Sequence, residues 1–109
     1  MANRLGNLGL LAQVRDDFDD AEAFYTQALE IEEALGRKEG MATQLNNLGV
    51  IAHDRDDLDA AIAFYARALE IEEALGRKAG MAIDLSNLGL ISLTRGDLDT
   101  AEDLSLIHI

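Results

Sequence analysis

Apolar residues recur along this chain with the spacing of amphipathic helices. Within residues 41–54, Leu45, Leu48 and Ala52 follow the i, i+3, i+7 spacing of one helical face. We therefore predict a helix over about 41–54 that begins a few residues earlier, and a second helix over about 58–75 with a broad apolar stripe. That stripe consists of Leu58, Ala61, Phe64, Tyr65, Ala68, Ile71 and Leu75.

The pattern repeats every 40 residues without insertions. Residues 28–38 are identical to residues 68–78, which chance does not produce. An internal period of this length is typical of stacked helical hairpins. We predict a single array with repeats at about 1–40, 41–80 and an incomplete 81–103. The repeated triplets are Asn7-Leu8-Gly9, Asn47-Leu48-Gly49 and Asn87-Leu88-Gly89.

Helix boundary signals agree with this period. Asp17, Asp57 and Asp97 stand just before the second helix of each repeat, where a carboxylate can accept hydrogen bonds from free backbone N–H groups. Gly36 and Gly76 follow the second helix, where a left-handed residue commonly ends a helix. The sequence thus predicts a helix–turn–helix hairpin in all three repeats, the last one included.

Composition narrows the class of partner. The formal net charge is -12, from 21 acidic and 9 basic residues. Such a chain repels phosphate backbones and anionic membrane surfaces, so we expect neither nucleic acid nor membrane as a partner. Cysteine is absent, and neither a signal peptide nor a long apolar run is visible. We expect a cytoplasmic location.

These repeats resemble the tetratricopeptide repeat (TPR) family. The resemblance implies an all-α fold, a right-handed α-solenoid of antiparallel helix pairs. The long period resembles the kinesin-light-chain-like subclass and bacterial arrays, although the family's late proline is missing and Glu33 and Glu73 stand near its place. The matching residues are Leu5, Leu8, Gly9, Ala12, Ala21, Tyr25 and Ala28, then Leu45, Leu48, Gly49, Ala52, Ala61, Tyr65 and Ala68, then Leu85, Leu88, Gly89, Ser92 and Ala101.

The repeated glycines carry a packing prediction. A glycine inside a helix costs roughly 1 kcal/mol relative to alanine. Gly9 and Gly49 are therefore expected where a neighbouring helix must approach closely.

The resemblance implies a concave groove lined by the first helix of each repeat. Asn7, Asn47 and Asn87 recur at one position there, and their amides can pair with the backbone of an extended peptide. The alternative is that each asparagine caps or bridges neighbouring helices. The predicted peptide-binding set adds Leu10, Val50 and Leu90 as apolar contacts, and Asn3, Thr43, Ile83 and His53 at positions that vary between repeats.

Charge is scarce in the predicted groove. Residues 1–14, 41–54 and 81–94 contain only Arg4, Asp54 and Asp84 as charged Asp, Glu, Lys or Arg residues. We therefore predict a nearly neutral groove and an acidic outer surface. The basic residues that clamp a carboxylate are missing, so an acidic C-terminal peptide is not the expected ligand. None of Asn3, Gly6, Thr43, Asn46, Ile83 and Ser86 is basic.

Catalytic and metal-binding patterns are weak. The acidic run at residues 16–20 lacks the glycine and terminal glutamate of an EF-hand loop. His53 has no partner that completes a metal or nucleophile set. Glu30, Glu32 and Glu33 are interpreted as a solvated face. We expect no enzyme activity, no metal and no cofactor.

We interpret both ends of the chain as the ends of a fragment of a longer protein. Met1 is in register with Met41 and Met81, which favours an internal methionine of a longer reading frame. Residues 104–109 leave the repeat and resemble the translated end of a transposon used in sequencing libraries, so we interpret them as an adapter-derived tail; a divergent natural end is the alternative.

The predicted function is a scaffold that binds a protein or an extended peptide. Its uncapped ends suggest self-association. The alternative is a regulatory or sensor segment of a larger multidomain signalling protein or enzyme.

Overall fold

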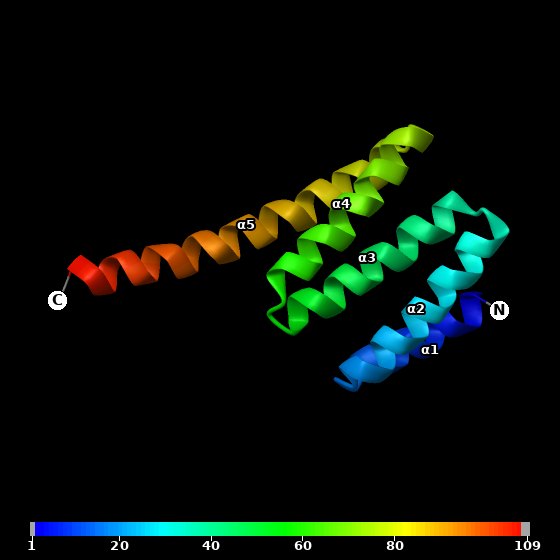
Figure 1. Ribbon diagram of the computed structural model, residues 1–109, viewed down its shortest axis with the longest axis horizontal. Coiled ribbons are helices and arrows are strands. Elements are labelled where there is room, and N and C mark those ends of the chain that lie inside the picture. Colours follow the sequence, from blue (N-terminus) through cyan, green and yellow to red (C-terminus); the bar gives the residue numbers. More distant parts are fainter. Residues whose placement is uncertain (1, 108–109) are drawn as a thin grey trace.

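The computed structural model describes the backbone of residues 2–107 and the side chains of residues 2–96. The described part is all helical, and consecutive helices run antiparallel (Figure 1). The predicted second helix of repeat two matches its observed bounds, and the first helix begins three residues earlier than residue 41. The helices are α1 (Ala2–Val14), α2 (Phe18–Leu35), α3 (Lys38–Asp54), α4 (Leu58–Leu75) and α5 (Lys78–Ile107).

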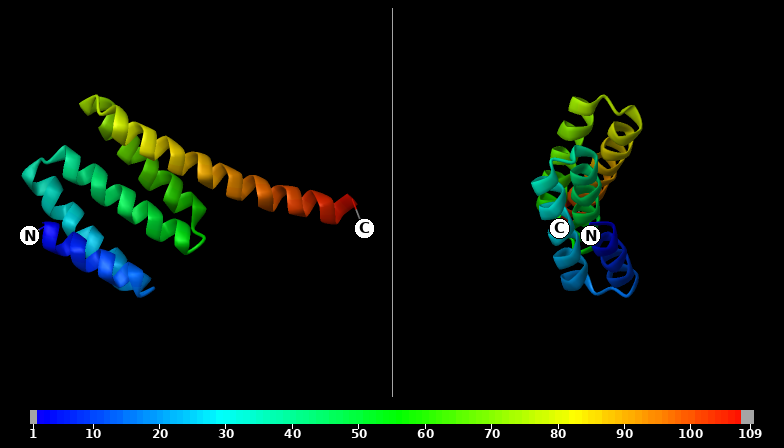
Figure 2. Two further views of the ribbon diagram at one scale, coloured as in Figure 1. Left: turned by 180° about the vertical axis from the view of Figure 1, so that it is seen from behind. Right: turned by 90° about the vertical axis from the view of Figure 1, so that its right-hand side faces the viewer.

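Each helix packs on the next one, so α1 and α2 form one hairpin and α3 and α4 form another. Seen from the side, α1 and α5 lie in one layer and α2 lies in the other (Figure 2). This is the predicted all-α solenoid of antiparallel helix pairs. Within the described residues, no helix has the length and apolar character that crossing a membrane requires.

The turns of the first two repeats follow the predicted boundary signals, except that Asp17 forms no capping hydrogen bond. Gly36 and Gly76 adopt left-handed backbone angles, with φ of 67° and 69°, and end α2 and α4 as predicted. Asp57 caps α4, because its Oδ1 accepts a hydrogen bond from the backbone N–H of Ala60 at 3.2 Å. Asp17 precedes α2 but makes no such side-chain hydrogen bond.

The repeated glycines make room for buried tyrosine rings. Tyr25 and Tyr65 are each 1% exposed. A Cβ atom added to Gly9 would lie 2.6 Å from Cε1 of Tyr25, and one added to Gly49 would lie 2.6 Å from Cε1 of Tyr65. The close approach predicted from the glycines is confirmed, and the group that approaches is the tyrosine of the same hairpin.

One predicted solvated residue is buried. Glu32 is 2% exposed, and so the interpretation of its carboxylate as part of a solvated face was wrong. Its side chain packs against Gly40, where a Cβ atom would lie 1.8 Å from Glu32 Oε2, and Arg37 Nε pairs with the carboxylate at 3.3 Å. Glu72 repeats this arrangement against Gly80. Because Gly40 has no side chain, α3 leaves room for the Glu32 carboxylate, and the positive charge of Arg37 offsets the negative charge of this carboxylate.

The third repeat does not form the predicted hairpin. Asp97 does not precede a new helix, because α5 continues through it to Ile107 (Figure 1). The tyrosine that packs on the glycine in the first two repeats is missing from the third, where Ser105 stands at that position in the sequence. Consistently, a Cβ atom at Gly89 would meet nothing within 4 Å. Without this packing contact, the helix continues.

Candidate peptide-binding groove

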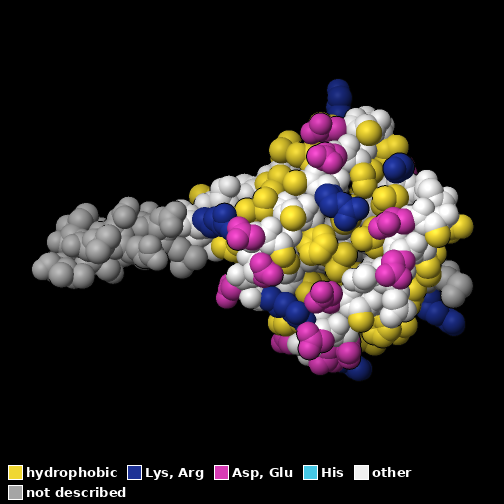
Figure 3. Space-filling view, viewed as in Figure 1, with side chains coloured by type: hydrophobic (Ala, Val, Ile, Leu, Met, Phe, Trp, Pro, Cys, Tyr) yellow, Lys and Arg dark blue, Asp and Glu magenta, His cyan; other side chains and the backbone are white. Residues whose placement is uncertain are grey.

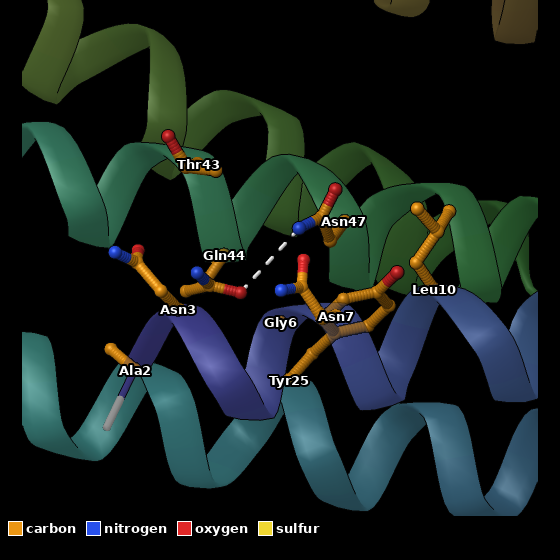
Figure 4. A pocket seen from close by; sticks show the side chains of 9 residues that line it. All are labelled: Ala2, Asn3, Gly6, Asn7, Leu10, Tyr25, Thr43, Gln44 and Asn47. Carbon is orange, nitrogen blue, oxygen red and sulfur yellow. Dashed lines mark hydrogen bonds between the residues drawn. The ribbon is translucent and has the colours of Figure 1, made fainter.

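A hollow of about 470 Å³ lies between the first helices of repeats one and two (Figure 4). Five of the predicted binding residues line it, from both α1 and α3. The structure therefore brings together five of the seven predicted residues that belong to the first two repeats, and Val50 and His53 are the two that it leaves out. The lining consists of Ala2, Asn3, Gly6, Asn7, Leu10, Tyr25, Thr43, Gln44 and Asn47.

Amide groups surround this hollow. Figure 4 shows Asn3 and Asn7 on α1 facing Gln44 and Asn47 on α3. Asn47 Nδ2 donates to Gln44 Oε1 at 3.4 Å, a long hydrogen bond within α3. Asn7 is exposed and Asn47 is half-buried, so the amides offer donors and acceptors at an open surface.

Tyr25 contributes to the hollow from the second layer. Its hydroxyl donates to Oε1 of Gln13 at 3.0 Å, which fixes the orientation of the phenol. Burial raises the pKa of Tyr25, so the hydroxyl keeps its proton at neutral pH. The phenol therefore forms a neutral, almost fully buried part of the wall of the hollow.

Sequence reasoning missed four lining residues: Ala2, Gly6, Tyr25 and Gln44. Tyr25 could have been found, because a tyrosine recurs one period later and each tyrosine is matched by a helical glycine. Gln44 stands at a position that reads Arg4, Gln44 and Asp84 through the repeats, the kind of variation that we used to select other groove residues.

The remaining predicted residues lie outside this hollow, either further along α3 or in the next repeat on α5. Val50 and His53 are half-buried on α3, and Val50 packs against the core of the second hairpin. On α5, Asn87 is half-buried, whereas Ile83 and Leu90 are 57% and 52% exposed. The two leucine positions of the set, Leu10 and Leu90, are both exposed enough to touch a ligand.

The three charged residues of the predicted groove differ in burial. Arg4 and Asp54 are exposed, whereas Asp84 is 0% exposed. Burial raises the pKa of Asp84; the Asn46 side chain lowers this pKa in part, and Glu72 raises it further. Of these three charged groups, only the carboxyl group of Asp84 is shielded from water.

The opposite layer has a different character. Figure 3 shows acidic side chains, with arginines and lysines among them, over the face on which α2 and α4 lie in front. Arg55, which directly follows α3, pairs there with Asp19 and, at 3.2 Å, with Glu22, while Arg95 pairs with Asp59 one repeat later. These ion pairs join each second helix to the first helix of the next repeat.

The stacked hairpins define a helical repeat protein of the solenoid class. The tetratricopeptide repeat family matches residues 1–74 and 40–105. These matches extend over nearly the whole chain, and the protein belongs to the tetratricopeptide repeat family.

A solved structure shows the same fold. The crystal structure of BtubC (BKLC) from P. vanneervenii is similar to this chain with a TM-score of 0.80 and 30% sequence identity. The match covers 94% of this chain and 42% of the BtubC chain, so this chain spans less than half of that protein's length. None of the curated proteins matches this chain.

Proposed function

We propose that this protein binds an extended peptide, or an extended segment of a partner protein, along the groove formed by α1, α3 and α5. Tetratricopeptide repeats generally mediate protein–protein interactions and are typically non-catalytic. The observation that supports a peptide ligand is the hollow between α1 and α3, because amides from both helices meet there at an open surface.

The chemistry of the hollow suits a neutral stretch of peptide. The side-chain amides can donate to peptide carbonyls and accept from peptide N–H groups. Leu10, which is 55% exposed, adds apolar contact at one end. The side-chain amides that line the hollow pair with backbone groups, which every peptide residue possesses, so they supply affinity without sequence preference. Sequence preference comes from the neighbouring positions that vary between repeats.

The test uses a peptide selected from a displayed library of random extended peptides on the intact chain. Asn47→Ala should weaken binding of that peptide by about 1–3 kcal/mol, the cost of leaving a buried polar partner unpaired. Thr26→Ala on the exposed side of α2 is the matched control and should leave the affinity unchanged. Unchanged affinity with lower stability in Asn47→Ala would instead assign the asparagine a structural role.

A further inference from the structure

The third repeat leaves one face of α5 without the helix that covers the equivalent face in the other two repeats. Among the described helices, α5 packs on α4, and it lies at the edge of the stack (yellow to red in Figure 2). Leu85 of α5 is 54% exposed, whereas its equivalent in α3, Leu45, is completely buried. The uncovered face consists of Ala82, Leu85, Gly89 and Ser92, which are all exposed and share one side of the helix.

The first two repeats show what covers this face. Tyr65 of α4 fills the space beside Gly49 of α3. Tyr25 of α2 fills the equivalent space beside Gly9 of α1. At Gly89 a Cβ atom would meet nothing within 4 Å, so the same space is open in α5. The residues of α3 that are equivalent to the uncovered face are all buried, namely Ala42, Leu45, Gly49 and Ala52.

Both covering helices share a sequence pattern around the tyrosine. Ala61, Tyr65 and Ala68 of α4 follow the order Ala-x3-Tyr-x2-Ala and are all buried. The same order recurs, equally buried, at residues 21–28 of α2. The small alanines let the two helices of a hairpin come close, and the tyrosine ring occupies the space that the glycine leaves. A helix with this pattern therefore fits the uncovered face of α5.

Charge favours an acidic helix at this place. Among the described side chains of α5, the charged groups that reach solvent are basic, because Asp84 is buried and the others are Lys78 and Arg95. Lys38, the equivalent of Lys78, lines a hollow of about 280 Å³ together with Glu70 in the C-terminal half of α4. A helix docked on α5 in the same orientation would bring acidic residues of its C-terminal half to Lys78, where opposite charges attract.

The chain itself offers no free tyrosine for this face. Tyr25 and Tyr65 are its two tyrosines, and both are buried within their own hairpins. A second copy would have to open a hairpin to present either ring, and the net charge of -12 on each copy opposes their approach. The occupant that fits is therefore a helix of another protein.

We propose that the uncovered face of α5 is a docking site for an amphipathic helix of a partner protein, which carries the order Ala-x3-Tyr-x2-Ala and an acidic C-terminal half. The helix lies antiparallel to α5, its tyrosine ring fills the space beside Gly89, and Leu85 becomes buried. Packing of an amphipathic helix on an apolar surface is a recurring mode of recognition. None of the residues predicted for the peptide-binding groove belongs to this face, so the inference does not depend on the proposed function.

The first experiment uses a synthetic peptide with the sequence of residues 57–77, blocked at both ends. Titrating it into the nitrogen-15-labelled intact chain should shift the amide signals of the uncovered face with saturation. Tyr65→Ala in the peptide should weaken binding at least about tenfold, although alanine favours the helix, because no ring fills the space beside Gly89. Ala63→Gln, at an exposed position of α4, is the control and should change the affinity less than about twofold. Saturable shifts confined to α1, or equal affinity of the native and Tyr65→Ala peptides, overturn the proposal.

The second experiment changes the chain. Gly89→Ala places a methyl group where the ring would lie, so the affinity for the native peptide should fall at least about tenfold. The new methyl group meets nothing within 4 Å in the free chain and favours the helix, so unfolding does not explain a loss of binding. Thr94→Ala, at a position whose equivalents in α1 and α3 are exposed, is the matched control. Unchanged affinity of Gly89→Ala overturns the site. A dimer of the chain alone that Gly89→Ala abolishes also overturns the proposal and assigns the face to a second copy.

Discussion

At the scale of single residues, the packing of this protein depends on glycines, which have no side chain and so leave space for a group from a neighbouring helix. Gly9 and Gly49 admit tyrosine rings, and Gly40 admits the Glu32 carboxylate. The sequence predicts that a neighbouring helix approaches the first two glycines closely, because a glycine costs free energy within a helix and needs a compensating contact, but it does not identify the tyrosines. It does not predict the third, since charge alone places a glutamate at the surface.

The glycine–tyrosine contact gives a matched pair of substitutions. Gly49→Ala should destabilise the protein by about 1–3 kcal/mol, because the new methyl group would overlap the Tyr65 ring and overpacking outweighs the gain in helix propensity. Gly89→Ala meets nothing within 4 Å and should stabilise α5 by up to about 1 kcal/mol. Urea denaturation measures both, and equal effects of the two substitutions would refute the packing argument.

Asp84 gives a pH-dependent prediction. Its pKa is raised in the folded protein, so its contribution to stability is fully present below the unfolded pKa of about 3.9 and is lost as the pH rises through the folded value. Asp84→Asn should therefore be more stable than the native chain at neutral pH, by roughly 1–3 kcal/mol. This difference should shrink as the pH falls.

The measurement is denaturant unfolding of both proteins over a series of pH values. Subtracting the two curves cancels the titration of the other acidic residues. A difference that stays constant with pH would mean that folding does not raise the pKa of Asp84, and a variant that is less stable at neutral pH would show that a partner stabilises the carboxylate in the folded state.

At the scale of elements, the first two hairpins could be predicted from the sequence and the third could not. Repeats one and two combine a turn, a small residue in the first helix and a tyrosine in the second. Repeat three keeps the turn residues Gly96 and Asp97 but has Ser105 where the tyrosine belongs. The observed α5 shows that turn residues alone do not break a helix when the tyrosine that the returning helix would bury is missing.

Restoring the missing packing residues should restore the hairpin. Replacing residues 104–109 with residues 64–69 of repeat two returns the aromatic pair to its place. We expect Gly96 then to adopt a positive φ, as Asp16 and Asp56 do at 60° and 61°. Carbon-13 chemical shifts of Gly96 report this change, and helical shifts at Gly96 in the grafted chain would disprove the explanation.

At the scale of the whole molecule, each repeat covers one face of its neighbour and leaves the end of the stack open. Leu48 and Ile51 of α3 are 3% and 2% exposed because α2 covers them. Their equivalents in α1, Leu8 and Leu11, are 39% and 47% exposed. The outer face of α1 therefore presents residues whose equivalents in α3 belong to the core, as expected for stacked repeats, which bury their faces only against neighbouring repeats.

This open face and the charge of the chain act in opposite directions on self-association. Apolar burial favours contact between copies, whereas a net charge of -12 on each copy opposes it. Salt at 0.1 M screens the charge repulsion beyond about 10 Å, whereas the favourable free energy of apolar burial remains. We therefore expect the average mass in sedimentation equilibrium to rise with both protein and salt concentration.

Two leucine substitutions test where the copies of the chain contact each other. Leu11→Gln on the open face of α1 should weaken the association, whereas Leu35→Gln, at a leucine that is 63% exposed at the end of α2, should not. Both substitutions remove a similar apolar side chain, so general solubility cannot separate them. A monomeric mass at every salt concentration would mean that charge repulsion outweighs the exposed core, and equal effects of the two substitutions would move the contact away from α1.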